Sequence, residues 1–133
     1  MKILFAVTGV FEMLVGLGFV IAPSPPATLC FGASLDGPGE MSLARVLGVL
    51  LLALGFAFWR ARTDVRAPSA HGLALALLAY NTAVAVVLVT SGVASRISAP
   101  ALWPAVGLHA TFAAWCGWNL QTGTALKRKA TLN

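Results

Sequence analysis

Two ionisable side chains lie inside long apolar stretches of this chain of 133 residues, where a membrane helix tolerates them least. Glu12 is near the middle of the first stretch, and His109 lies inside the last one. A carboxylic acid and an imidazole in a low dielectric could act as general acid and base on an apolar substrate, in isomerisation, epoxide opening or proton transfer. The same groups could instead hydrogen-bond the carbonyls of a quinone without any chemistry. Spacing alone does not separate these two uses.

Three further polar residues complete the candidate site. At about 1.5 Å per residue, Glu12, Asn81 and His109 share a layer near the middle of the membrane, with Tyr80 at a neighbouring depth. Arg45 starts nearer the outer surface, but its long side chain can reach inward. An unpaired charge at this depth costs about 3 kcal/mol, so Glu12 should be either protonated or paired, and we hypothesise a Glu12–Arg45 ion pair. The predicted ligand-binding residues are Glu12, Arg45, Tyr80, Asn81 and His109.

Metal and nucleotide chemistry have little support in the sequence. One histidine with one glutamate is too few ligands for a metal site, so none is predicted. His71 and His109 lie too far apart along the membrane normal to share one haem iron, although haem held by His109 alone stays open. No HExxH, CxxC, Walker or GxSxG pattern occurs. The cofactor is therefore unknown.

The elements that must position these residues are four apolar stretches. Hydrophobic residues make up 59% of the chain and charged residues 10%, whereas a soluble domain is about a quarter charged. Each stretch is close to the roughly 20 residues needed to cross a bilayer. Short connections make consecutive spans antiparallel neighbours. The sequence therefore predicts one all-α domain, an integral membrane up-down four-helix bundle, with spans 3–22, 41–59, 71–90 and 101–120.

The basic residues predict the orientation of these spans. If there are four spans, one side of the membrane carries nearly all of the loop and tail cations, namely Lys2, Arg60, Arg62, Arg66, Lys127, Arg128 and Lys129. Because cytoplasmic loops are enriched in Lys and Arg, both termini should be cytoplasmic in a multi-pass protein of the cell inner membrane. The net charge of +5 is explained as a topology signal, so no nucleic-acid partner is expected. The predicted partner is the lipid bilayer.

Small residues indicate how the helices meet, because close backbone approach carries much of the packing in lipid. Gly9 and Gly16 share a helix face with Glu12, and Thr8 lies one turn from Glu12. A similar face on the second span holds Arg45, Gly48, Leu52 and Gly55. These faces should contact other helices.

The loop 23–40 is the longest connection predicted on the outer side. It has a proline-rich start, a short apolar patch at 29–31 that should lie on the membrane surface or cap the bundle, and a Gly37-Pro38-Gly39 breaker before the second span. Cys30 lies in this loop and Cys116 in the cytoplasmic half of the fourth span. A disulfide needs Cα atoms within about 7 Å, so the two cysteines should not pair.

The segment 29–62, LCFGASLDGPGEMSLARVLGVLLLALGFAFWRAR, resembles a recurring pattern in small four-helix bacterial membrane proteins of the DoxX-like and related uncharacterised kinds. The likeness is carried by the FG turn, the DGPG breaker, and AR followed by LG and LLALG. The later LLAYN and WPAVGLHA segments are similar to such proteins too. Some DoxX-like proteins are associated with quinone-linked oxidoreductases, so the resemblance implies an accessory or quinone-proximal role. It carries no catalytic residues over.

Three hypotheses follow from these patterns. The first is a ligand-binding accessory protein whose polar pocket opens toward the outer leaflet and takes a lipid-like or quinone-like molecule. The second is a small membrane enzyme that uses Glu12 and His109 as acid and base. The third is a structural or assembly subunit that packs against a protein partner or forms a homo-oligomer. A cavity beside Glu12 would favour the first two, and a tightly filled bundle would favour the third.

Overall fold

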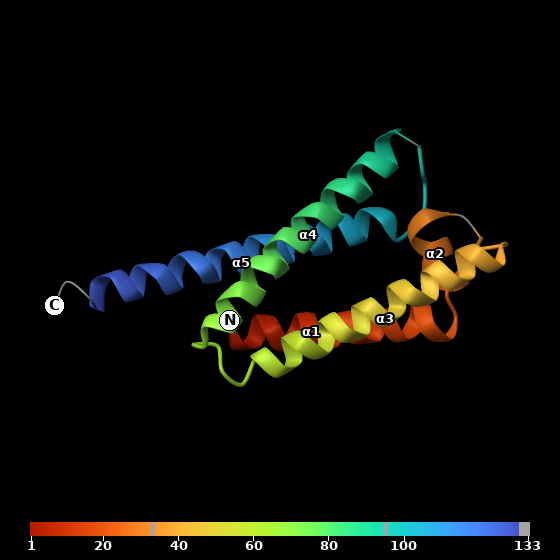
Figure 1. Cartoon of the computed structure of the whole chain (residues 1–133). Helices are drawn as coiled ribbons and strands as arrows, with labels where there is room; N and C mark the ends of the chain where they lie inside the picture. Colours follow the sequence, from red (N-terminus) through yellow and green to blue (C-terminus); the bar gives the residue numbers. More distant parts are fainter. Residues whose placement is uncertain (33, 95, 131–133) are drawn as a thin grey trace.

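The computed structural model describes residues 1–32, 34–94 and 96–130, with side chains as far as residue 122. The described residues form helices and connections, with no strand among them. The described part of the chain contains five helices, four long and one short, and Figure 1 shows how they are arranged. Their bounds are α1 Lys2–Ile21, α2 Ser24–Phe31, α3 Pro38–Ala61, α4 Pro68–Ala94 and α5 Leu102–Ala130.

Prolines and glycines set the bounds of the short helix α2. Pro25 and Pro26 lie in its first turn, where the missing backbone N–H groups would be unpaired in any case. Gly32 ends the helix in the left-handed conformation, with φ of 67°, which glycine adopts without a steric penalty. The apolar patch predicted for this loop is thus part of a helix.

The Gly37-Pro38-Gly39 segment begins a helix instead of merely separating two. Gly37 is the N-cap of α3, and Pro38 is its first residue. The Glu40 carboxylate accepts hydrogen bonds from the backbone N–H groups of Asp36 (3.1 Å) and Gly37 (3.3 Å). These bonds satisfy free donors at the start of the helix.

Glycines bring α1 and α3 into backbone contact. A Cβ atom built on Gly16 would lie 2.7 Å from the carbonyl oxygen of Gly48, and one on Gly9 would lie 2.9 Å from that of Gly55. Both distances are too short for any side chain. The glycine faces predicted from the sequence therefore meet each other, in an antiparallel register.

The long helices form two pairs, α1 with α3 and α4 with α5. Figure 1 shows α1 and α3 lying side by side, with α4 crossing α5 obliquely. Although α3 and α4 are consecutive and joined by a short connection, they touch little. The expectation that consecutive spans pack as neighbours is confirmed for α1 with α3 and for α4 with α5. It is wrong for α3 with α4, because the packing face of α3 is taken up by α1. Much of the rest of α3 is exposed, including Leu47, Leu50 and Phe56.

The core differs between the two ends of the molecule. At the end away from α2, one cluster joins all four long helices and is made of Leu4, Phe5, Phe58, Ala70, Ala74, Leu77 and Cys116. Toward α2, the core is divided. One cluster there contains Phe19, Ala27 and Leu51, and a separate cluster contains Leu88, Ala99 and Leu102. The two pairs therefore share a core at only one end.

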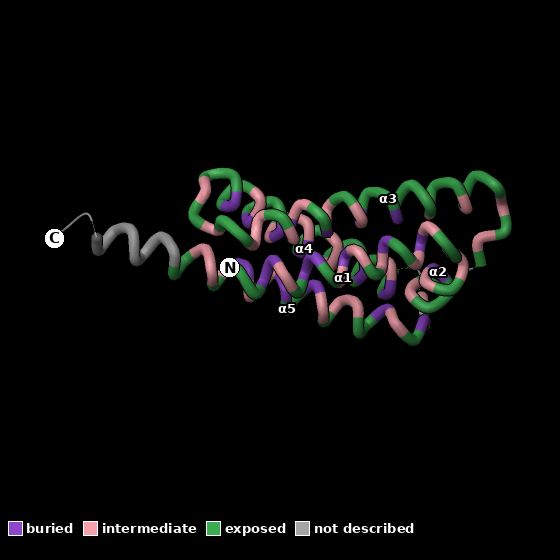
Figure 2. The backbone as a smooth tube through the Cα atoms, turned by 90° about the horizontal axis from the view of Figure 1, so that it is seen from below, coloured by how far each residue is buried: buried purple, intermediate pink, exposed green. Residues whose placement is uncertain are grey.

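Burial identifies α1 as the central helix. In the most apolar window of α1, 39% of residues are buried, against 22% in α3 and in α4. Figure 2 shows the same contrast, with buried positions frequent along α1 and long exposed stretches on α3. A position on α1 is thus more often enclosed by other helices than a position on α3 or α4.

Within the described residues, three helices, α1, α3 and α4, are long and apolar enough to cross a membrane. This finding agrees with a membrane protein built of transmembrane helices. The fourth predicted span, 101–120, lies in α5, which continues as helix to Ala130. The side chains of Lys127, Arg128 and Lys129, used above for orientation, lie outside the described ones. Both cysteines are free, as expected.

Candidate functional site

Glu12 is buried at the centre of the molecule, with 1% of its surface exposed. Its Oε2 atom accepts a hydrogen bond of 3.2 Å from the hydroxyl of Tyr80. Glu12 belongs to α1 and Tyr80 to α4, so this bond connects the two helix pairs. Tyr80 also packs against both the shared core cluster and the cluster around Phe19. Its position is thus at the level where the single core divides.

Asn81 and His109 form the second half of the site. The Nδ1 atom of His109 lies 2.8 Å from Oδ1 of Asn81, and the Asn81 amide donates to the carbonyl of Leu77 at 2.9 Å. Because the amide NH₂ is used on Leu77, Oδ1 must accept, so His109 carries its proton on Nδ1. Nε2 is then left as an acceptor. The rings of Tyr80 and His109 meet edge to face, 5.8 Å between centroids.

Two buried oxygen atoms of the site have no hydrogen-bond partner among the described residues: Oε1 of Glu12 and Oγ1 of Thr8. Thr8 is fully buried, one turn before Glu12 on α1. Other helical threonines donate to the carbonyl four residues earlier, at Thr82, Thr90, Thr111 and Thr122. Thr8 does not. The sequence places Thr8 beside Glu12 but gives no sign that its hydroxyl is unused.

The structure does not form the hypothesised Glu12–Arg45 ion pair. Arg45 is exposed, and the partner of the Glu12 carboxylate in the described part of the chain is Tyr80. The reason is the register of the glycine contacts, which puts Arg45 level with Phe19. That is seven residues, or about 10 Å, from the level of Glu12. Four of the five predicted ligand-binding residues are thus brought together, and Arg45 is not.

The position of Tyr80 limits how Glu12 and His109 could act together as acid and base. Glu12 and His109 make no hydrogen bond to each other in the described structure, and the Tyr80 side chain contacts both. A substrate group would have to reach the carboxyl and the imidazole from the sides that Tyr80 and Asn81 leave open. Within the described residues, no group of three His, Cys, Asp or Glu side chains is arranged to hold a metal ion.

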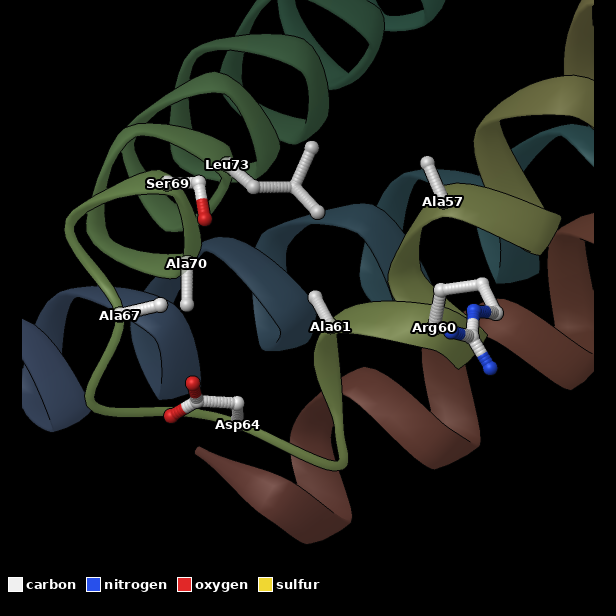
Figure 3. Close-up of a pocket in the computed structure, with 8 residues that line it drawn as sticks. All are labelled: Ala57, Arg60, Ala61, Asp64, Ala67, Ser69, Ala70 and Leu73. Carbon is white, nitrogen blue, oxygen red and sulfur yellow. The ribbon is translucent and has the colours of Figure 1, made fainter.

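A hollow at the α3–α4 connection lies apart from this site. Figure 3 shows its lining, which is Ala57, Arg60, Ala61, Asp64, Ala67, Ser69, Ala70 and Leu73. The Arg60 guanidinium points away from the Leu73 and Ser69 side chains. None of the predicted site residues lines this hollow, so it adds nothing to the Glu12 cluster.

The Asn81–His109 bond should be measurable by a double-mutant cycle. We expect a coupling free energy of about 1 kcal/mol between Asn81→Leu and His109→Phe, within the range found for buried interhelical hydrogen bonds in membranes. Unfolding of each variant in mixed micelles gives the four free energies required. Thr82→Val, whose hydroxyl bonds only its own helix, should show no coupling to His109→Phe. Additive effects at Asn81 and His109 would contradict the hydrogen bond.

Comparisons with known proteins give no independent indication of function, so the geometry of the Glu12 site is the basis for assigning one. No family model matches the chain, and searches of curated proteins and of solved structures find no match. The DoxX-like resemblance accordingly remains an expectation from the sequence.

Proposed function

We propose that this chain is a four-span membrane protein that binds an apolar small molecule, lipid-like or quinone-like, through Glu12, Tyr80, Asn81, His109 and Thr8. The observation that carries the proposal is the pair of buried, unpartnered oxygen atoms on Glu12 and Thr8. A buried polar group without a partner costs about 1–3 kcal/mol, and intramembrane ionisable residues mark ligand and proton pathways. A ligand with a polar head would recover that cost.

The division of the core supports access to the site from one side. Beyond Tyr80, toward α2, the two helix pairs pack around separate clusters. On the other side of Tyr80, the shared cluster closes the bundle. An apolar ligand would therefore reach Glu12 from the half of the membrane nearer α2, which is the outer leaflet in the predicted orientation.

Two wider roles fit this proposal. An accessory function in a membrane process, as in some DoxX-like proteins, requires only binding and a protein partner. A small membrane enzyme is the second candidate, since Tyr80 contacts both Glu12 and His109 and a proton could pass between them across a bound substrate.

The proposal includes α5 as the fourth span and cytoplasmic termini in the inner membrane. Packing of α5 along α4 supports the fourth span, because a helix that covers a membrane span over much of its length lies at the same depth. The arginines of the α3–α4 connection support the orientation. In this arrangement α2 lies on the outer side.

The two cysteines allow a test of this orientation. We expect a membrane-impermeant maleimide to label Cys30 in right-side-out vesicles and to leave Cys116 unlabelled, since Cys116 is fully buried and donates to the Ala74 carbonyl. Burial raises the pKa of the Cys30 thiol, so the thiolate fraction is small at neutral pH and labelling should speed up steadily as the pH rises. Cys30→Ser should abolish the signal. Labelling of Cys30 only after the vesicles are opened would reverse the orientation.

Ligand binding is tested by purification in mild detergent and native mass spectrometry. We expect a small apolar molecule to accompany the wild-type protein, and its occupancy to fall about tenfold in Glu12→Leu, as the loss of about one charged or polar hydrogen bond predicts. Arg45→Gln is the matched control and should leave occupancy unchanged, because Arg45 is exposed. Bare protein in all three samples would argue against a binding function and direct the search to a protein partner.

A further inference from the structure

The unpartnered atoms of the site differ in what they can do, and this difference narrows the class of ligand. This step rests on the proposed function. Thr8 Oγ1 and Glu12 Oε1 lie one helical turn apart on α1, both buried. The Thr8 hydroxyl both donates and accepts a hydrogen bond. Glu12 Oε1 accepts when the carboxyl is ionised, and when it is protonated it can take either role.

The neighbouring side chains supply no proton to these two atoms. His109 carries its proton toward Asn81 Oδ1. The one hydroxyl proton of Tyr80 is used on Glu12 Oε2. A ligand that pairs Thr8 Oγ1 and Glu12 Oε1 in either protonation state of the carboxyl must therefore be able to donate as well as to accept.

The common polar head groups of apolar molecules differ in whether they can both donate and accept a hydrogen bond. A carbonyl, as in a quinone, only accepts, so it leaves Glu12 Oε1 without a donor when the carboxyl is ionised. An ammonium only donates and cannot receive the Thr8 hydroxyl proton. A hydroxyl does both. We infer that the Thr8–Glu12 face of the site receives the hydroxyl group of an apolar alcohol, of the long-chain or isoprenoid class, with the tail directed between the helix pairs toward α2.

The test compares ligands that share the same apolar tail and differ in the polar head group. Hexadecanol and farnesol are titrated against the protein in lipid nanodiscs, beside their methyl ethers, their amines and the corresponding aldehydes. We expect each alcohol to bind about tenfold tighter than its methyl ether, the worth of one buried hydrogen bond. The aldehyde and the amine should bind less tightly than the alcohol as well.

Variants of Thr8 test whether its hydroxyl causes the preference for an alcohol over its methyl ether. Thr8→Val keeps the shape of the side chain and removes the hydroxyl, so the alcohol and ether should then differ by less than about twofold. Thr8→Ser should retain the preference, which also guards against a folding defect as the cause. Thr82→Val, at an exposed threonine whose hydroxyl bonds its own helix, should bind as the wild type does.

The outcomes distinguish this inference from the proposed function. Equal binding of alcohol and ether in the wild type would overturn the inference while leaving a ligand site in place. Tighter binding of the amine would overturn it in favour of an ionised Glu12, and tighter binding of the aldehyde in favour of a carbonyl ligand. If no probe of either tail binds, the inference is overturned, and the native mass spectrometry of the purified protein decides the proposed function separately.

Discussion

Gly16→Ala is expected to destabilise the protein by about 3 kcal/mol, the upper range for overpacking a tight interface. The added Cβ would lie 2.7 Å from the Gly48 carbonyl oxygen and 2.8 Å from the Leu52 amide nitrogen. Both are backbone atoms, which cannot rotate aside as a flexible side chain can. Relief therefore requires α1 and α3 to move apart along their whole crossing, including the second contact between Gly9 and Gly55.

Gly18→Ala is the matched control, two residues further along the same helix. A Cβ at Gly18 meets nothing within 4 Å. Alanine has a higher helix propensity than glycine by about 1 kcal/mol, so this substitution should leave stability unchanged or raise it. The two variants thus add the same atom to the same helix and are predicted to act in opposite directions.

Equilibrium unfolding in mixed micelles, followed by tryptophan fluorescence, measures both effects. Cysteine crosslinking between α1 and α3 in a background without native cysteines reports whether the pair has separated. Gly55→Ala should behave like Gly16→Ala, since its Cβ would lie 2.7 Å from the Gly9 carbonyl oxygen. Equal stability of the Gly16 and Gly18 variants would show that the glycines do not bring α1 and α3 into backbone contact.

The sequence predicts the candidate site better than it predicts the arrangement of the helices. Rise per residue is nearly constant in a helix, so the depths of Glu12, Asn81 and His109 follow from their distance to the span ends. The structure places all three at one level with Tyr80. Glycine spacing also identifies the faces of α1 and α3 that meet, because only small residues allow such close approach.

Arg45 shows why the partners of a residue are harder to predict. It shares a helix face with Gly48 and Gly55, which suggests an inward position, but a face does not fix the register between two helices. That register depends on which glycine meets which, and the Gly16–Gly48 contact moves Arg45 away from Glu12. Side-chain length cannot compensate, since Arg45 is exposed.

The pairing of helices follows the sequence in part. Consecutive spans pack together in α1 with α3 and in α4 with α5, as expected, while α3 and α4 touch little despite their short connection. The strength of each interface depends on side-chain packing, which the length of a connection does not report. The continuation of α5 to Ala130 has another cause. Hydropathy predicts where the apolar stretch ends and not where the helix ends, and no proline follows residue 120 to end the helix.

Phe58→Ala is expected to destabilise the protein by about 3–5 kcal/mol, as for other buried phenylalanines. Phe58 is fully buried and stacks on Phe5 of α1, with ring centroids 6.0 Å apart. It lies in the one cluster that contains residues of all four long helices. In lipid, moving the phenylalanine ring between the protein interior and the surrounding tails changes the free energy little. The dispersion contacts around a removed ring are still lost.

Phe56→Ala supplies the control, because Phe56 lies on the same helix with 59% of its surface exposed. Its loss should change stability by less than about 0.5 kcal/mol, as for other surface positions. Phe58→Ala should also increase the distance between spin labels placed on α1 and α5, measured by electron spin resonance. The shared cluster holds the two helix pairs together on the side of Tyr80 away from α2. Widening there would open the Glu12 site from its closed side and, under the proposed binding function, lower ligand occupancy. An unchanged distance with reduced stability would mean instead that Phe58 supports only the α1–α3 pair.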